Sequence, residues 1–321
     1  MERPSGQQFT LTAGDTVAVI TEVGGGIRHL QHEDIEILDG FPETAVCDGA
    51  RGQTLLPWPN RVQDGRYRWG GQDLQLALTE PARHNAIHGL TRWANWELIE
   101  LTVDRVQLRH RLHAQIGWPF LLRCDLHYEL RDAELQVTTR LLNVGQQPCP
   151  AAAGAHPYLS AGGALIDDCE LQFHAGSYLP TDDRGIPISQ LHVAGSDLDF
   201  SEGRRIGDQQ IDLTFTELTR SPGGSSRQSA TTSPDAAVVT DGQVAEVRLH
   251  RPDGQTVRLW AGEGYDYLEV FTGDTLAPAR RRRGLGVEPM TSPPNALQTG
   301  TDLAYLEPGQ TLEVRWGVGL A

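Results

Sequence analysis

Lysine is absent from this chain of 321 residues, so arginine and histidine are its only basic side chains. Chemistry that needs a side-chain amine is therefore excluded. The excluded classes are Schiff-base aldolases, pyridoxal-phosphate enzymes with their lysine, and P-loop proteins with their phosphate-binding lysine.

Cysteine is scarce, and no two of the four cysteines stand in a CxxC spacing. This spacing argues against a zinc knuckle or a dithiol redox site. In a chain of this length, Cys47, Cys124, Cys149 and Cys169 indicate buried thiols of a reduced compartment.

Long apolar runs are missing as well. No stretch approaches the ~20 apolar residues of a membrane span, and the first 19 residues lack the apolar core of a signal peptide. The formal net charge is −15. That charge repels nucleic acid and anionic lipid, and it accommodates a neutral or cationic small ligand more easily. We expect a cytoplasmic protein with no nucleic-acid or membrane partner.

Helical periodicity is nearly absent, and alternation of apolar and polar residues takes its place. In residues 122–130, every second residue is apolar and the residues between them are polar; the apolar ones are Leu122, Cys124, Leu126, Tyr128 and Leu130. Residues 135–141, 257–261 and 312–320 repeat the pattern. Alternation of this kind is typical of half-buried antiparallel strands. With 35 glycines and 19 prolines as punctuation, it predicts a large all-β sandwich or barrel.

Residues 221–236 interrupt the pattern with a stretch rich in glycine, serine, threonine and proline. We interpret this stretch as a flexible surface insertion, with a mobile lid over a pocket as the alternative. Because the strands on both sides look alike, we expect one domain over residues 1–321.

Two of the 11 histidines stand in an unusual backbone setting. His88 precedes Gly89, which permits an unusual φ or the close approach of a ligand. His156 precedes Pro157, which restricts His156 to an extended conformation. A side chain held at one angle suits catalysis. The alternative is an ordinary surface or core histidine, as we expect for most of the others.

Glu288 follows the apolar residues 284–287 and precedes Pro289. It is either a desolvated functional carboxylate that could serve as a general base, or a surface residue at a strand end. A metal site of two histidines and a glutamate is a competing interpretation, but no HxH or HExxH signature supports it. The motifs GxSxG and GxGxxG are also missing, which argues against a serine hydrolase and a dinucleotide enzyme.

Two further features leave alternatives open. Five tryptophans in the first 120 residues could stack on sugar rings or could fill a core; they are Trp58, Trp69, Trp93, Trp96 and Trp118. The four arginines of residues 280–283 could form a solvated turn or could bind an anionic group such as a sugar phosphate.

Several motifs in order make the chain resemble the aldose 1-epimerase (galactose mutarotase) family. They are Pro59-Asn60-Arg61-Val62, Gly65-Arg66-Tyr67, Asn85, His88-Gly89-Leu90, Trp93, Trp96, Gly154-Ala155-His156-Pro157-Tyr158, Ile211-Asp212-Leu213-Thr214-Phe215 and Val287-Glu288-Pro289-Met290. Each motif is short, but the ordered set extends from about residue 10 to the C-terminus.

The resemblance implies a β-supersandwich of mostly antiparallel strands that acts on a hexose without a cofactor or metal. It implies that Glu288 is the general base and His156 the general acid of mutarotation. Arg61, His88 and Asp212 would hold the sugar hydroxyls and ring oxygen, and Asn60, Tyr158 and Trp93 would line the same site. A monomer or homodimer is expected. The alternatives of the same fold are a sugar-phosphate mutarotase that uses the arginine run and a non-catalytic carbohydrate-binding protein.

Overall fold

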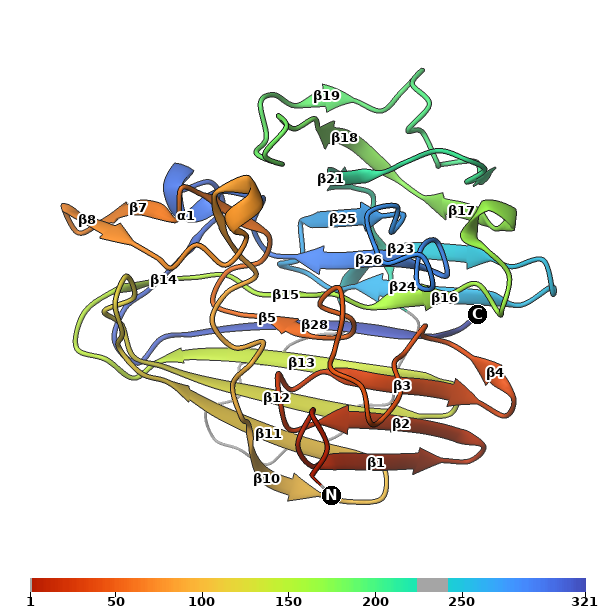
Figure 1. Cartoon of the computed structure of the whole chain (residues 1–321), viewed down its shortest axis with the longest axis horizontal. Coiled ribbons are helices and arrows are strands. Elements are labelled where there is room, and N and C mark those ends of the chain that lie inside the picture. The colour runs from red at the N-terminus through yellow and green to blue at the C-terminus, as the bar shows by residue number, and fades with distance from the viewer. Residues whose placement is uncertain (1, 224–241) are drawn as a thin grey trace.

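The computed structural model describes residues 2–223 and 242–321, and strands make up most of the regular structure (Figure 1). The predicted all-β class is confirmed. The helices of the described chain have only three or four residues each, so none of them could cross a membrane. They are η1 (Pro81–Arg83), η2 (Ile166–Asp168) and α1 (Ala296–Thr299).

The larger sheet has ten strands, and neighbouring strands pair antiparallel throughout. The alternation in residues 122–130 is confirmed, because its apolar parity is buried along the strand. In spatial order the strands are β10 (Glu97–Leu101), β11 (Arg105–Leu112), β12 (Leu122–Arg131), β13 (Glu134–Asn143), β28 (Thr311–Leu320), β24 (Thr256–Ala261), β23 (Gln243–His250), β17 (Glu170–Phe173) and β20 (Arg204–Arg205), with β22 (Ser221–Pro222) paired to β23.

A second sheet of eight strands carries most of the chemistry described below. Its central strand β26 is buried along its whole length, and Glu288 is the one charged residue in it. In spatial order the strands are β19 (Leu191–His192), β18 (Ala175–Leu179), β21 (Asp212–Leu218), β25 (Tyr267–Phe271), β26 (Gly284–Met290), β15 (Gly154–Ala155) and β5 (Thr54–Leu55), with β16 (Tyr158–Ser160) also paired to β26.

Smaller sheets complete the fold. A four-stranded sheet packs against β11 and β12 of the larger sheet and lies in front of it in Figure 1. Its strands are β1 (Gln8–Ala13), β2 (Thr16–Thr21), β3 (Ile27–His32) and β4 (Ile35–Glu36). Three two-stranded ladders pair β6 (Arg61–Gln63) with β9 (Asn85–Ile87), β7 (Arg66–Trp69) with β8 (Gln72–Gln75), and β14 (Cys149–Ala151) with β27 (Ala304–Leu306).

The tryptophans settle one of the open alternatives. Trp58, Trp96 and Trp118 are buried in the core, where Trp58 and Trp118 lie 5.9 Å apart between ring centroids. Trp69 packs on Phe120 and Tyr305. The sugar-stacking interpretation is therefore wrong for these four rings, and only Trp93, which is 57% exposed, remains available to a ligand.

The predicted insertion at 221–236 falls mostly outside the described residues. Of this stretch the structure describes residues 221–223, in which Ser221 and Pro222 pair with Val244 and Gln243 of β23.

Candidate active site

Cross-strand register places a row of polar side chains on one face of the eight-stranded sheet. Thr214 of β21 lies opposite Glu269 of β25, and Glu269 lies opposite Glu288 of β26. Tyr158 of β16 lies opposite Gly286, so His156, two residues before Tyr158, continues the row next to Glu288. Directly opposed residues share a face of a sheet. The register therefore brings groups from four distant segments together.

His156 is held by backbone hydrogen bonds on both sides. Its N–H donates to the carbonyl of Gln53 (3.0 Å), and its carbonyl accepts from the N–H of Gly52 (2.9 Å). The ring stacks on Tyr158 with centroids 5.1 Å apart. The predicted fixed orientation thus comes from neighbouring strands as well as from Pro157.

The imidazole of His156 and the carboxylate of Glu288 are in direct contact, with 3.0 Å between Nε2 and Oε1. Both side chains are buried. Among the described residues, Nδ1 of His156 and Oε2 of Glu288 have no hydrogen-bond partner. Within the described part of the chain, the side chains of His156 and Glu288 therefore meet through the single Nε2–Oε1 contact.

His88 lies beside this pair, with its ring centroid 5.3 Å from that of His156. Its backbone is left-handed (φ 61°), and its Nδ1 accepts a hydrogen bond from the N–H of Asn60 (3.2 Å). Burial lowers the pKa of His88 well below its ordinary value, and the positive charges of His156, Arg92 and Arg61 add to this effect. His88 is therefore neutral, with its hydrogen on Nε2.

The tautomer of His88 also bears on metal binding. Ligand atoms of His88, His156 and Glu288 lie within 4.8 Å of one another, which is close enough to hold an ion. A nitrogen that carries a hydrogen cannot coordinate a metal, however, and Nδ1 of His88 is occupied by Asn60. This hydrogen bond favours a donor role of Nε2 toward a ligand over metal binding.

Gly89 shows why a glycine follows His88. Its φ is +69°, and a Cβ atom at this position would lie 2.0 Å from the carbonyl oxygen of Leu56. The close approach anticipated from the sequence is therefore an approach to the protein's own backbone.

Arg61 enters the site from β6 and is held by a two-point contact with Glu80. Its Nε lies 2.9 Å from Oε2, and its Nη2 lies 3.1 Å from Oε1. Asn85 donates from Nδ2 to the same Glu80 carboxylate (3.1 Å) and to the carbonyl of Arg184 (2.9 Å). The orientation of Arg61 therefore depends on residues that are distant in the sequence.

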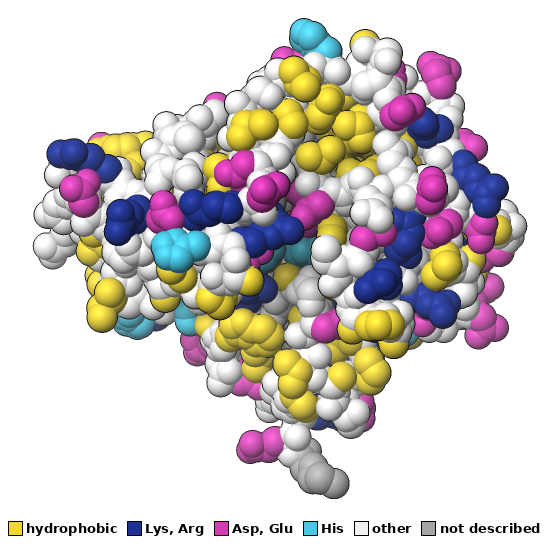
Figure 2. All heavy atoms as spheres, turned by 45° about the horizontal axis from the view of Figure 1, so that its top comes forward, with side chains coloured by type: hydrophobic (Ala, Val, Ile, Leu, Met, Phe, Trp, Pro, Cys, Tyr) yellow, Lys and Arg dark blue, Asp and Glu magenta, His cyan; other side chains and the backbone are white. Residues whose placement is uncertain are grey.

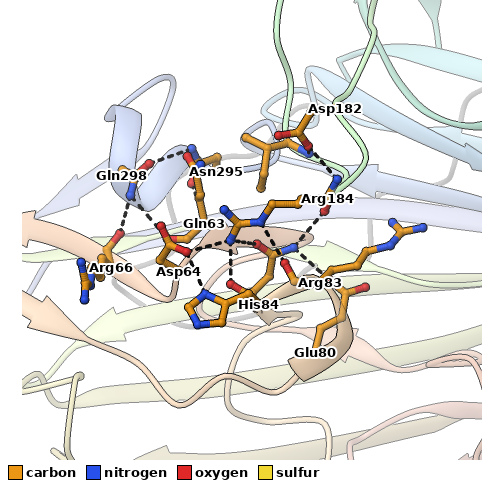
Figure 3. Close-up of polar contacts among 12 residues, drawn as sticks. Gln63, Asp64, Arg66, Glu80, Arg83, His84, Asp182, Arg184, Asn295 and Gln298 are labelled. Carbon is orange, nitrogen blue, oxygen red and sulfur yellow. Dashed lines mark hydrogen bonds and ion pairs between the residues drawn. The ribbon is translucent and has the colours of Figure 1, made fainter.

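Arg184 ties together the turn that carries Glu80 and Arg83 (Figure 3). Its Nε donates to the carbonyl of Arg83 (3.0 Å), and its Nη2 donates to Asp64 Oδ1 and to the carbonyl of His84 (both 2.8 Å). The neighbouring Gly185 lies against the guanidinium of Arg61, where an added Cβ would be 2.8 Å from Nη1. One loop thus supports Arg61 directly and through Asn85.

A cavity of about 400 Å³ opens above these residues, within the ~300–1,000 Å³ range of small-molecule sites. Figure 2 shows basic and acidic side chains intermixed around a hollow on this face. The eight side chains proposed from the sequence all line the cavity: Asn60, Arg61, His88, Trp93, His156, Tyr158, Asp212 and Glu288.

The eight differ in what they offer a ligand. Tyr158 already donates its hydroxyl to the carbonyl of Gly49 (2.9 Å), so it supports the ring of His156. Asp212 lies 3.8 Å from Nη1 of Arg83 and is partly exposed. Asn60 uses its Oδ1 to accept from the N–H of Arg61 (2.8 Å). Trp93 stands exposed at the cavity wall.

Several cavity residues escaped the sequence reasoning. Glu80 and Arg92 lie in loops and Arg83 ends the short helix η1, all without a recognisable sequence pattern. Only the folded chain brings them to the cavity. Glu269, which lies opposite Glu288 beside the site, could have been recognised from the sequence. It is the single charged residue of β25, whose other residues are apolar or aromatic. Burial raises the pKa of Glu269 well above its ordinary value, and the charges of Asp212 and Glu288 raise it further.

Cys47 also lines the cavity. Burial raises the pKa of its thiol to about 12, so the thiol is neutral. All four cysteines are free, and the prediction of buried thiols is confirmed for Cys124, Cys149 and Cys169.

The arginine run 280–283 is not among the residues that line the cavity. Arg282 is buried and pairs with Asp167 (2.7 Å) and Asp274 (2.9 Å). Arg280 donates to the carbonyl of Gly40 and lies 3.4 Å from Asp39. Arg283 donates to the carbonyl of Gly163 (3.3 Å). Three of the four arginines therefore have structural partners, and a solvated turn is also the wrong description of Arg282.

The family model of aldose 1-epimerase matches residues 7–317. The chain therefore belongs to the aldose 1-epimerase family, as its motifs indicated. It is 32% identical over 307 residues to the uncharacterized protein YihR of Escherichia coli K12, covering 95% of this chain and 91% of YihR.

Solved structures of this family have the same fold. A putative aldose 1-epimerase from Escherichia coli K12 superposes with a TM-score of 0.80 at 19% identity, covering 98% of this chain and 99% of that one. The galactose 1-epimerase from Lactobacillus acidophilus superposes with a TM-score of 0.76 at 19% identity, covering 97% and 93%. The predicted galactose mutarotase-like β-supersandwich is thereby confirmed.

Proposed function

We propose that this protein is an aldose 1-epimerase, or mutarotase, which interconverts the α and β anomers of a hexose by opening and reclosing the ring. The contact of 3.0 Å between His156 Nε2 and Glu288 Oε1 in the cavity carries the proposal. Mutarotation moves protons at two oxygens, the ring oxygen and O1, that are bonded to the same carbon. The acid and the base that exchange protons with these two oxygens must therefore lie side by side. The two catalytic carboxylates of a glycosidase, by contrast, stand about 5–9.5 Å apart.

The pair has the residue types that the reaction needs. Glu288 takes the proton from the O1 hydroxyl while protonated His156 gives one to the ring oxygen, and the bond between C1 and the ring oxygen breaks. The open aldehyde then rotates about its C1–C2 bond and recloses on the other face with the two roles reversed. Each proton transfer contributes roughly 10²–10⁴-fold.

The surrounding side chains orient the sugar. Neutral His88 donates from Nε2, and Arg61 is held in place by Glu80 to donate to a hydroxyl or to the ring oxygen. Asp212 accepts hydrogen bonds from sugar hydroxyls. The exposed ring of Trp93 offers an apolar face to the sugar.

Two alternatives from the sequence are weaker. The arginine run cannot bind a sugar phosphate in this cavity, since Arg280 and Arg282 contact other groups and none of the four lines it. A non-catalytic sugar-binding protein has no need of a buried acid–base pair such as His156 and Glu288.

Polarimetry on freshly dissolved α-D-glucose and α-D-galactose tests the proposal. The protein is expected to speed the approach to rotational equilibrium. For Glu288→Gln and His156→Asn we expect kcat to fall by two decades or more, about 2.7 kcal/mol or more of transition-state stabilisation.

Matched control variants are Glu263→Gln and His113→Asn, which change exposed residues outside the cavity. They are expected to retain the wild-type rate. If the wild-type protein accelerates no aldose, the proposed function is wrong. If His156→Asn changes only KM, His156 binds the sugar and is not the acid.

A further inference from the structure

Arg92 differs from the other two arginines of the cavity in its partners. Arg61 is held by Glu80, and Arg83 lies 3.8 Å from Asp212. Within residues 2–223 and 242–321, the side chain of Arg92 forms no ion pair and donates no hydrogen bond, although it lines the cavity. No carboxylate of the described residues therefore touches its guanidinium.

The missing partner matters because Arg92 is only partly exposed to water. Burial lowers the pKa of its guanidinium, and this effect outweighs the charge of Glu288 that raises it. Charges in a partly buried site are screened less than charges on the surface. A ligand that supplies an anionic acceptor would therefore interact more strongly with Arg92 than with a surface arginine.

The backbone of Arg92 is fixed beside the cavity that its side chain lines. Its carbonyl accepts a hydrogen bond from Nε2 of Gln53 (2.8 Å). Gly24 packs so closely that an added Cβ would lie 2.5 Å from the same oxygen. The guanidinium carbon lies 5.9 Å from the ring centroid of Trp93.

We propose that Arg92 binds an anionic group of the substrate, so that the preferred sugar is an aldose with a carboxylate or phosphate away from its anomeric carbon. This inference rests on the proposed function and names its substrate class. A guanidinium presents a planar fork of donors that matches an oxyanion at two points. A neutral hydroxyl can accept a hydrogen bond, but it cannot balance the charge.

The other charges of the cavity limit where the anionic group can lie. Glu288 serves the anomeric carbon, and its negative charge repels an anion there. Glu80 and Asp212 lie against Arg61 and Arg83, whereas Arg92 has no carboxylate in contact among the described residues. The formal net charge of −15 disfavours anions in general, but a contact inside the cavity is less screened than surface charges are.

The experiment compares sugars that differ only in the charged group. D-Glucuronate and D-glucose form one pair, D-galacturonate and D-galactose the second, and glucose 6-phosphate tests phosphate in place of carboxylate. Mutarotation is measured at constant ionic strength for the wild type and for Arg92→Gln. Arg68→Gln, a surface variant outside the cavity, is the control.

We expect the wild type to prefer one of the anionic sugars by about tenfold or more in kcat/KM, mainly through KM. In Arg92→Gln, kcat/KM should fall about tenfold more for the anionic sugar than for its neutral counterpart, and Arg92→Lys should retain part of the preference. Equal or better use of the neutral sugars by the wild type overturns the inference but leaves the proposed function intact. An equal loss for both kinds of sugar in Arg92→Gln overturns it as well.

Binding to Glu288→Gln separates the two proposals if no turnover is seen. Calorimetric titration of this variant with D-glucuronate and D-glucose reports the charge preference without catalysis. Because removal of the Glu288 charge itself favours an anion, the double variant Glu288→Gln/Arg92→Gln is titrated beside it. A preference for glucuronate that disappears with Arg92 supports its role, whereas an equal preference in both variants contradicts it.

Discussion

Glu269 is a buried carboxyl group whose replacement should make the protein more stable at neutral pH. Its side chain is 3% exposed. Asp212 of β21, Glu288 of β26 and Arg61 of β6 are the charged groups that act on it, and the hydroxyl of Thr214 donates to it. Because burial raises its pKa well above the ordinary value, Glu269 keeps its proton in the folded protein.

The sign of the effect follows from proton binding. Below the ordinary pKa of a glutamate, the group is protonated in the folded and unfolded chains alike, and it has no effect. Above that pKa the unfolded chain releases the proton while the folded chain retains it. The free energy of unfolding then falls by about 1.4 kcal/mol for each pH unit, until the pH reaches the folded pKa.

Glu269→Gln removes this penalty and keeps a side chain of similar size that can still accept from Thr214. We expect the variant and the wild type to have similar stability near pH 4. The variant should become progressively more stable than the wild type as the pH rises above the ordinary pKa of a glutamate toward the raised pKa of the folded protein. Urea unfolding at several pH values measures the difference directly.

Glu263→Gln, an exposed position in the turn before β25, is the matched control and should show no such trend. A stability difference for Glu269→Gln that is constant with pH, or that favours the wild type as pH rises, would refute the reasoning. It would mean that Glu269 is ionised in the folded protein.

Two further predictions concern the support of the site. Arg184→Gln should raise KM for the sugar several-fold with kcat largely retained, because Arg184 orients Arg61 through Asn85 and Glu80. An unchanged KM, with Arg205→Gln as the remote control, would contradict this role. Gly89→Ala should destabilise the fold by roughly 1–3 kcal/mol or more, because its Cβ would lie 2.0 Å from the carbonyl oxygen of Leu56. Gly70→Ala is the control, because Gly70 also has a positive φ but no atom lies within 4 Å of its added Cβ. Equal losses of stability in the two variants would show that backbone strain, and not the clash with Leu56, sets the cost.

The strands and the fold class could be predicted because alternation is a local signal. In β12 the apolar parity from Leu122 to Leu130 is the buried one, since successive side chains of a strand point to opposite faces. The tryptophans show the limit of such reasoning. Trp93 and Trp96 are three residues apart, yet one is 57% and the other 2% exposed. Their sequence context does not distinguish them, because packing against distant strands decides which ring is covered.

The sequence allowed residues of the candidate site to be predicted where a neighbouring glycine or proline makes the backbone unusual. His88 before Gly89, His156 before Pro157 and Glu288 before Pro289 stand out because glycine and proline restrict or release particular dihedral angles. Glu269 could also have been found, as a lone charge in an apolar strand. Its position opposite Glu288 could not, because that position depends on strand register.

Only the tertiary structure showed which charged side chains pair with one another. The four consecutive arginines 280–283 drew attention as an anion site, yet Arg282 pairs with Asp167, 115 residues away. Arg92 carries no local signal and lines the cavity without an acidic partner among the described residues. The local sequence determines which backbone dihedral angles a residue prefers and how buried and exposed residues alternate along a strand. The distance between two charges depends on how distant strands pair, and the partner that neutralises an arginine is therefore visible only in the folded chain.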